Sequence, residues 1–402
     1  MKILVISHAA GTPEIGPNMR SYYLGRKLVQ RGHAVHIVGS GRFHKYQNSP
    51  LLNNKYTTKV IEGINYHWLP TYNYKKRNYQ QVVNQFDFAL KLWQYQKKWM
   101  KLNPDILIFS SPPPLASIPA IFLKRKLGIS LIFEERDIWP LGILNIGKLG
   151  KKHLYVKLLQ AVENYTYKNA DSIVSVKKGD YKYYRENFSK YYKKYYFIPN
   201  GYDVKVSTKT STLNRSKNSK FVFGYIGAFS NVYNLRLILE AARQLKSQNH
   251  IFFQLVGTGE DLEKLKTQAS EWGLNNVEFT GSVPKDEIME YLINFDVALI
   301  SLKTTPAYKF GISANKMFEY MYARRPILAI YNTDFDDVQD AKCGITLKEP
   351  SVDEVVQNMK MLANTNPDIL QKMGDNAYKY FCEHYTFEII ANRYENLFEK
   401  LK

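Results

Sequence analysis

The feature that most constrains the fold is an alternation of apolar strands and amphipathic helices. Residues 2–8, KILVISH, form a short apolar run, and residues 33–40 form a second one. Residues 19–32 lie between them and repeat apolar positions at helical spacing up to Gly32, a typical helix stop. A strand–helix–strand unit places its strands parallel in one sheet. The sequence therefore predicts an α/β fold.

The alternation runs along the chain twice, which predicts two Rossmann-like domains facing across a cleft. A chain of 402 residues is also too long for one ordinary core. Further strands are expected at 104–111, 130–137, 172–176, 195–201, 220–229, 252–259, 277–283, 296–302, 327–332 and 344–348. The predicted parts are a first domain at 1–203, a polar linker at 204–219, a second domain at 220–383 and a C-terminal helix at 384–402.

The net positive charge of the chain lies in its first half. The first 200 residues contain 32 Lys and Arg against 11 Asp and Glu, whereas the other 202 contain 24 against 25. This asymmetry indicates an anionic partner for the first half, namely a membrane surface, a phosphorylated acceptor or nucleic acid. Residues 72–101 mix basic and aromatic residues and favour a membrane surface, although a core stripe beside solvated lysines is the alternative. The residues expected on that surface are Val82, Phe86, Leu90, Trp93 and Trp99, with Lys91, Lys97 and Lys98.

Two cysteines are too few for a disulfide framework, which is typical of a cytoplasmic protein. We expect a chain that associates peripherally with the inner face of the plasma membrane. The sequence contains no zinc-ligand spacing, no phosphate-binding G-x-x-x-x-G-K-[ST] loop and no nucleic-acid-binding motif. No metal, no other cofactor and no nucleic-acid partner are therefore expected.

Glycine loops follow three of the predicted strands. Gly16 follows the first strand, Gly227 follows the strand that opens the second half, and Gly257 and Gly259 follow the next one. Glycine lets a backbone approach an anion closely, and the following helix offers free amides. One such loop is more typical of a structural turn, but three together favour a ligand site at the strand ends. Arg20, one turn into the first helix, could add charge to that site or be exposed.

Charged residues gather at the end of one predicted strand. EERDIWP, residues 134–140, places Glu135, Arg136 and Asp137 there. Carboxylates in this position can perform acid–base chemistry, and a surface ion-pair cluster is an equally good interpretation.

The segment FGISANKMFEYM, residues 310–321, places an acid on a mostly apolar helix. Glu319 stands three residues after Lys316, so a salt bridge along the helix is one interpretation. The other is that Glu319 accepts hydrogen bonds from hydroxyl groups of a ligand.

These segments together resemble the family 4 glycosyltransferases of the GT-B fold, over nearly the whole chain. The resemblance rests on VGTGED, FTGSVPKDEIMEYL, DVALISL and GISANKMFEYM. EERDIWP and IPNG are similar to the bacterial subgroup that builds surface polysaccharides, including fucosamine and colanic-acid transferases. The family implies retaining transfer of a hexosyl or N-acetylhexosaminyl group from a UDP-sugar. The acceptor would be a lipid-diphosphate-linked or glycan acceptor in capsule, O-antigen or exopolysaccharide synthesis.

The resemblance also implies roles for individual residues. Glu319 matches the second acid of the family's Glu-x7-Glu motif, which holds the ribose hydroxyls, whereas the first acid is replaced by Gly311. The family's usual Arg and Lys pair for the diphosphate is not evident after the glycine loop at Gly227, so Lys316 and the backbone at Ser313, Ala314 and Asn315 would take its place. Gly257, Gly259 and Val283 would lie near the base. Gly16 and Arg20 would face the diphosphate or the sugar. Asp137, with Glu135 and Arg136, would line the reaction centre. The C-terminal helix at 384–402 would cross back to the first domain, as in the family.

Two other functions remain compatible with the sequence. A nucleotide-sugar epimerase of the same architecture would have no need of the basic and aromatic surface. A non-enzymatic basic protein that binds nucleic acid would leave Glu319 and the glycine loops of the second half unexplained.

Overall fold

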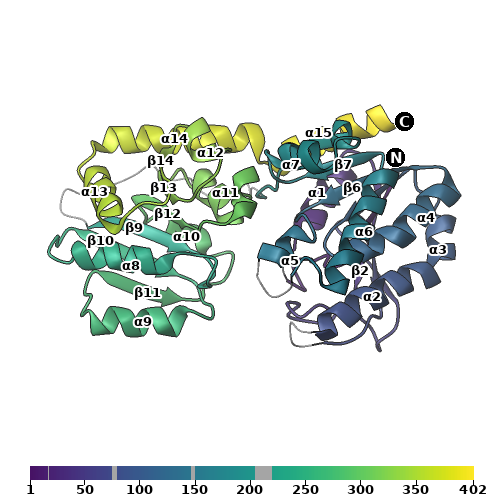
Figure 1. Cartoon of the computed structure of the whole chain (residues 1–402), viewed down its shortest axis with the longest axis horizontal. Helices are drawn as coiled ribbons and strands as arrows, with labels where there is room; N and C mark the ends of the chain where they lie inside the picture. Colours follow the sequence, from purple (N-terminus) through teal and green to yellow (C-terminus); the bar gives the residue numbers. More distant parts are fainter. Residues whose placement is uncertain (17, 75–78, 146–149, 204–219) are drawn as a thin grey trace. The chain divides into compact units, whose positions relative to one another are not determined.

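The computed structural model describes residues 1–16, 18–74, 79–145, 150–203 and 220–402. The chain divides into two compact units (Figure 1). Unit 1 comprises Met1–Asp203 together with Phe387–Lys402, and unit 2 comprises Val204–Thr386. The predicted linker at 204–219 lies outside the described residues, as do residues 75–78 of the basic and aromatic stretch.

Unit 1 is built on a sheet of eight strands in the order β3-β4-β2-β1-β5-β6-β7-β8. Its strands are β1 (Lys2–Ser7), β2 (Ala34–Ser40), β3 (Thr57–Ile61), β4 (Ile64–Leu69), β5 (Ile106–Ser110), β6 (Ser130–Glu135), β7 (Ser172–Ser175) and β8 (Tyr195–Phe197). The pairs are parallel except for β3 with β4, an antiparallel hairpin that the strand pattern does not predict.

The helices of unit 1 cover both faces of this sheet. They are α1 (Arg20–Gln30), α2 (Tyr79–Gln94), α3 (Gln96–Leu102), η1 (Pro114–Ala116), α4 (Ser117–Leu127), α5 (Leu141–Asn145), α6 (Leu154–Asn169), α7 (Asp180–Asn187), η2 (Tyr192–Lys194) and α15 (Phe387–Leu401). One apolar core joins α1 and α15 to the sheet, and a second joins α2, α3, α4, α6 and α7 to the opposite face. Because the central strands are buried on both faces, they are apolar at nearly every position.

Unit 2 has a parallel sheet of six strands in the order β11-β10-β9-β12-β13-β14. The strands are β9 (Phe221–Ile226), β10 (Ile251–Val256), β11 (Val277–Gly281), β12 (Val297–Ser301), β13 (Ile327–Ile330) and β14 (Gly344–Leu347). The helices are α8 (Leu235–Gln244), α9 (Leu262–Glu271), α10 (Ile288–Leu292), η3 (Pro306–Phe310), α11 (Asn315–Tyr322), α12 (Asp337–Asp340), α13 (Val352–Ala363) and α14 (Pro367–His384).

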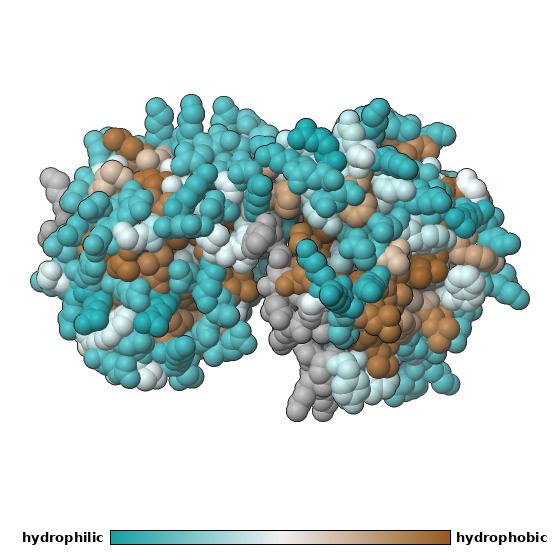
Figure 2. All heavy atoms as spheres, in the orientation of Figure 1, coloured by the Kyte–Doolittle hydropathy of each residue, from teal (hydrophilic) through white to brown (hydrophobic). Residues whose placement is uncertain are grey.

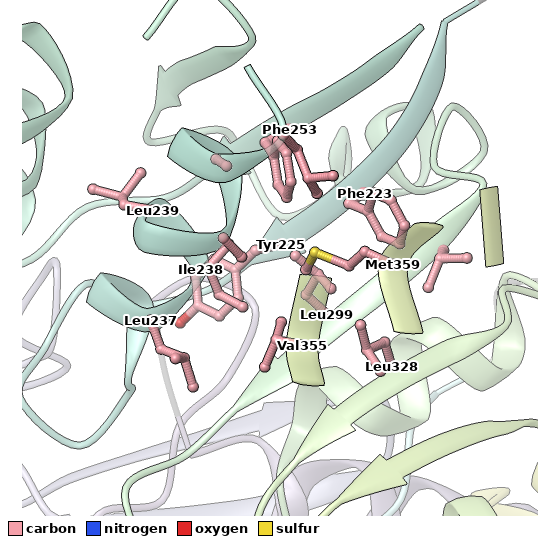
Figure 3. Packing of buried hydrophobic residues seen from close by; sticks show 14 of the residues in the cluster. Phe223, Tyr225, Leu237, Ile238, Leu239, Phe253, Leu299, Leu328, Val355 and Met359 are labelled. Carbon is pink, nitrogen blue, oxygen red and sulfur yellow. The ribbon is translucent and has the colours of Figure 1, made fainter. Parts of the chain in front are cut away.

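The core of unit 2 lies between the sheet and helices α8, α9 and α13. Figure 3 shows Phe223 and Leu299 of the sheet packed with Ile238 of α8 and with Val355 and Met359 of α13. This core fixes the strands whose carboxyl ends carry the predicted donor residues. In the described part of both units, no helix has the length and apolar character needed to cross a membrane.

Candidate active site

Three loops of unit 2 are joined at the carboxyl ends of β9, β10 and β11. The amide of Gly227 donates to the carbonyl of Val256 at 3.0 Å, and the amide of Gly257 donates to the carbonyl of Gly281 at 2.7 Å. The amide of Phe229 bonds to the carbonyl of Thr258 at 2.9 Å. The two glycine loops predicted in the second half therefore form one continuous edge with the loop after β11, whereas the third predicted loop, at Gly16, belongs to unit 1.

Close packing explains why two of these positions are glycine. A Cβ on Gly257, where φ is +135°, would lie 1.9 Å from the carbonyl oxygen of Gly227. A Cβ on Gly227 would lie 2.6 Å from the Nζ atom of Lys316. A larger residue at either position would separate the loops or displace the lysine.

Helix α11 starts beside this edge. The hydroxyl of Tyr320 accepts from the amide of Ile226 at 2.9 Å, and its distance to the carbonyl of Ile226 is 3.3 Å, so the helix is fixed to the end of β9. Ala314 caps the helix without a side-chain hydrogen bond, and Asn315 is exposed. The first amides of a helix lack partners within the helix and carry partial positive charge, which favours an anionic ligand.

Lys316 extends from the first turn of α11 into the apolar layer. Its side chain is buried, and Nζ donates to the hydroxyl of Tyr225 at 2.7 Å. Nζ also lies over the rings of Tyr225 and Tyr233, 3.9 and 3.6 Å from their centroids. Figure 3 shows Tyr225 next to Ile238 in the core. Burial lowers the pKa of Lys316 well below its ordinary value, and nearby Glu319 only partly opposes this.

Glu319 is half-buried on the next turn of α11. Burial raises the pKa of Glu319 to about 7, against the opposing charges of Lys285 and Lys316. Among the described residues, Glu319 forms no ion pair with Lys316. The interpretation of these two residues as a salt bridge along the helix is therefore wrong. The carboxyl group stands near the amine without bonding to it.

Unit 2 thus brings together Gly227, Gly257, Lys316 and Glu319, with Gly259 in the same glycine loop as Gly257. Val283 is half-buried in the loop that follows β11, two residues before Lys285. Ser313 and Ala314 are half-buried immediately before α11. Gly311, at the position of the family's first acid, is buried with φ of +112°, a value that disfavours an acidic side chain.

In unit 1, Arg20 lies in a buried network rather than in solvent. Its Nε donates to Glu134 at 2.9 Å, and its terminal nitrogens donate to the carbonyls of Ile198 and Pro199. Glu134 also accepts from Ser110 and from Tyr394 of α15. Burial would raise the pKa of Glu134, but Arg20 and these hydroxyls hold it below its usual value. The predicted contact of Arg20 with the donor remains a prediction, and the guanidinium already has protein acceptors.

Glu135 lies on the opposite face of the sheet, among tyrosines. Its carboxyl oxygens are 2.9 and 2.8 Å from the hydroxyl of Tyr167, and Tyr184 donates to it as well. The same Tyr167 hydroxyl lies 3.0 Å from Glu163. A hydroxyl has one proton to donate, so the contacts are all satisfied only if one of the two acids is protonated. Burial is the main reason that the pKa of Glu135 lies well above its ordinary value, and the nearby charge of Glu163 raises it further.

The remaining predicted residues of unit 1 are nearer to solvent. Arg136 is half-buried and its amide donates to the hydroxyl of Ser111 at 3.3 Å, whereas Asp137 is exposed. Of the three predicted catalytic residues, Asp137 therefore has the carboxylate most open to a substrate. Gly16 lies in the loop between β1 and α1 with φ of +110°, and a Cβ at this position would lie 3.4 Å from the carbonyl oxygen of Lys45.

His8 is a residue of interest that the sequence interpretation missed. It directly follows β1, is buried between Phe43 and Phe88, and its Nε2 lies 2.6 Å from the amide oxygen of Asn84. Because the Asn84 amide nitrogen donates to the carbonyls of Tyr72 and Arg42, its oxygen must accept the proton of His8 Nε2. Burial lowers the pKa of His8 to about 4, so the ring is neutral near pH 7. No sequence motif surrounds it, and Asn84 is distant in the sequence.

Across the described ranges, no three His, Cys, Asp or Glu side chains are placed to hold a metal ion.

Each half of the chain matches the model of a glycosyltransferase family. The model of glycosyltransferase family 4 matches residues 16–206, and the model of glycosyl transferases group 1 matches residues 208–380. An uncharacterized glycosyltransferase of Methanocaldococcus jannaschii, MJ1069, is 27% identical over 333 residues, which are 78% of this chain and 80% of the relative. The O-antigen chain mannosyltransferase C of Escherichia coli is 25% identical over 257 residues, covering 62% of this chain and 66% of the relative.

Solved structures agree at the level of the fold. HepE of Anabaena, in complex with UDP and glucose, has a TM-score of 0.67 and 14% identity, with all of both chains covered. The two family models follow the two α/β units with their parallel sheets. The chain therefore belongs to glycosyltransferase family 4 and has the GT-B fold.

Proposed function

We propose that this glycosyltransferase transfers a sugar from a UDP-sugar, with retention of anomeric configuration, to a lipid-diphosphate-linked or polysaccharide acceptor. The product would be a bacterial surface polysaccharide such as a capsule, an O-antigen or an exopolysaccharide, as in the subgroup of fucosamine and colanic-acid transferases. The name of the mannosyltransferase relative supports the pathway, and the ligands of HepE support the nucleotide. The observation that carries the proposal is the placement of Lys316 and Glu319 beside the joined glycine loops.

In unit 2, the base, the ribose and the diphosphate of the donor would each have a matching group. Glu319 lies where a carboxylate could accept two ribose hydroxyls, and the glycine-lined edge with Gly257, Gly259 and Val283 would hold the base. Lys316 and the backbone from Ser313 to Asn315 would bind the diphosphate. As the bond to the sugar breaks, the diphosphate gains negative charge, and fixed amides and an amine stabilise that charge.

In unit 1, we assign Asp137 to the acceptor. Asp137 is exposed at the end of β6, at the edge where ligands of parallel sheets bind. It would orient the acceptor hydroxyl or accept its proton. Gly16 shapes the loop after β1 at the same edge of the sheet, and Glu135 would support this region from the buried tyrosine cluster.

The substitution Glu319→Ala tests the donor site directly. If Glu319 holds ribose hydroxyls, the variant should bind UDP more weakly by about 1–3 kcal/mol, roughly 5- to 150-fold in Kd. Isothermal titration calorimetry with UDP measures this difference. Glu383→Ala is the matched control, because Glu383 is exposed on α14 and should leave the affinity unchanged. Equal affinity of wild type and Glu319→Ala would reject the proposed role.

We further propose that unit 1 docks on an anionic membrane surface through α2. Tyr79, Val83, Phe86, Leu90 and Trp93 are exposed on this helix at alternating spacings of four and three, which is one helical stripe. Ile118 of α4 and Leu158 of α6 are exposed on neighbouring helices. In Figure 2, hydrophobic atoms gather over α2 and α6.

One residue of the predicted membrane surface belongs to the core instead. Trp99 is 2% exposed, and its Nε1 donates to the carbonyl of Leu92 at 3.2 Å. Lys97 and Lys101 of α3 are exposed and supply positive charge near the end of α2. An amphipathic surface of this kind binds anionic lipid through apolar burial and charge together.

A further inference from the structure

The amine of Lys316 is buried without a carboxylate partner. Its side chain is 7% exposed, and among the described residues its hydrogen-bond acceptor is the neutral hydroxyl of Tyr225. A lone ammonium group removed from water costs several kcal/mol unless an opposite charge compensates it. A buried cationic side chain in this state either loses its proton or awaits an anion.

Aromatic contacts do not remove that cost. The rings of Tyr225 and Tyr233 lie 3.9 and 3.6 Å from Nζ. A cation over an aromatic ring is stabilised, but by less than the cost of burying a lone charge. The rings keep water from Nζ, and because this desolvation outweighs their attraction for a cation, the amine is neutral in the free enzyme, in agreement with the lowered pKa of Lys316.

Glu319 faces this amine, but no ion pair joins the two among the described residues, and the charge of Glu319 only partly favours the ammonium form. Tyr225 comes from β9 and Tyr233 from the segment before α8, and both are neutral phenols whose pKa burial raises. Glu319 follows on α11 itself, and Lys285 contributes a positive charge near Glu319 from the segment before α10. Burial also raises the pKa of Tyr320 on α11, so it is neutral as well.

We propose that Tyr225 and Tyr233 are positioning residues that hold Lys316 as a neutral amine, which takes up one proton when the diphosphate of the donor binds. The inference rests on the proposed function, because it takes the anion to be a nucleoside diphosphate. The bound diphosphate would place negative charge directly against the amine, in addition to the partial effect of Glu319, so the ammonium form becomes stable there. No covalent bond changes, and one proton moves to Nζ.

The source of this proton depends on pH through Glu319. Glu319 has to be ionised to accept two ribose hydroxyls, and its pKa is about 7 in the free chain. Below pH 7, Glu319 loses a proton on binding while Lys316 gains one, so the two exchanges cancel. Above pH 8, Glu319 is already ionised, and the proton taken up by Lys316 comes from the buffer.

Titration calorimetry with UDP-glucose near pH 8.5, in Tris and in a buffer of lower ionisation enthalpy, measures the exchange. UDP-glucose is the probe because its diphosphate has no group that titrates near neutral pH. The expected result is uptake of about one proton by the wild type, with affinity falling about tenfold for each pH unit above 8. Lys316→Met should abolish the uptake, whereas Lys309→Met, at an exposed lysine of η3, should retain it.

A second variant tests the tyrosine ring itself. Tyr233→Leu opens the amine to water, so Lys316 should already be charged in the free variant and proton uptake near pH 8.5 should fall. A ring with only a packing role would change the melting temperature but not the proton count. Unchanged uptake in Tyr233→Leu would overturn the role of that ring.

The outcomes separate this inference from the proposed function. Binding of UDP-glucose without proton exchange near pH 8.5 would overturn the neutral amine and leave the donor site standing. If the folded wild type bound neither UDP-glucose nor UDP, the proposed donor would be wrong, and the inference would fall with it. Because the buffer comparison uses the wild type, its result stands even if a variant fails to fold.

Discussion

Glu163 and Glu135 are two buried acids that share the hydroxyl of Tyr167. Burial raises the pKa of Glu163 to about 8, although Tyr167 and Gln160 lower it in part. In the unfolded chain the same group titrates near its ordinary value of about 4.5. The folded chain therefore binds more protons than the unfolded chain between these two values. Over that window, stability must fall as pH rises.

Glu163→Gln should remove the contribution of Glu163 to this pH dependence, while buried Glu135 keeps its own. At about pH 9 the variant should be more stable than the wild type by up to about 5 kcal/mol, and near pH 4.5 the difference should be small. The amide introduced by the substitution can keep the bond from Tyr167, and the amide of Gln160 can rotate to face it. Urea unfolding at several pH values measures the difference, with exposed Glu186→Gln as the control. A stability difference that did not grow with pH would contradict the proton sharing.

Single residues were predictable where the spacing within one helix decides their neighbours. Lys316 and Glu319 are three residues apart on α11, so their common side follows from the sequence. The roles of Glu134 and Glu135 did not follow, because consecutive strand residues point to opposite faces. Glu134 meets Arg20 and Tyr394 on one face, and Glu135 meets Tyr167 and Tyr184 on the other. Which helix covers each face depends on pairings distant in the sequence.

At the scale of elements, α2 presents two different apolar stripes. Phe88 and Leu92 face the core, whereas Phe86, Leu90 and Trp93 face outward. The mixture of basic and aromatic residues predicted Phe86, Leu90 and Trp93 on the outward stripe, but it included half-buried Val82 in place of Val83. It also could not separate the stripe from Trp99, which α3 places in the core.

Replacing both Leu90 and Trp93 by Ser tests the proposed docking of α2. The double variant should bind phosphatidylglycerol vesicles at least about tenfold more weakly, because it loses apolar surface that lipid would bury. A vesicle flotation assay measures the bound fraction. Leu52→Ser is the control, since Leu52 is 71% exposed but lies outside α2. If both variants floated like the wild type, α2 would not be the docking element.

The antiparallel hairpin of β3 and β4 was not predicted from the sequence. Glu62 and Gly63 have φ of +47° and +79°, as in the tight two-residue turns that join antiparallel strands. The residues of β3, TTKVI, are mostly exposed, so they lack the apolar run by which the other strands were recognised. The central strands were predictable because burial on both faces makes them continuously apolar.

At the scale of the whole molecule, unit 1 takes its last helix from beyond unit 2. Phe387, Ile390, Tyr394, Leu397 and Phe398 of α15 are buried in the core that includes β1 and α1. The prediction of a returning C-terminal helix came from the family resemblance, since an amphipathic helix by itself does not specify the sheet it covers.

Replacing Ile390 and Leu397 by Ala tests how much unit 1 depends on α15. Each change should cost about 2–5 kcal/mol, and together they approach the whole stability of an ordinary domain. Hydrogen–deuterium exchange should become faster in β1 and β2 while β9 and β10 stay protected. Leu265→Ala in α9 is the reciprocal control and should affect unit 2 alone. Equal exchange in β1 with and without the two changes would show that α15 is dispensable.

The return of α15 also has a consequence for the order in which the protein is made. Residues 387–402 leave the ribosome after all of unit 2, so unit 2 has its complete sequence available before unit 1 does. Until then the nascent chain carries an unfinished apolar surface over β1 and β2, a target for chaperones. The unit assigned to the acceptor thus completes its core only after the donor unit has been synthesised.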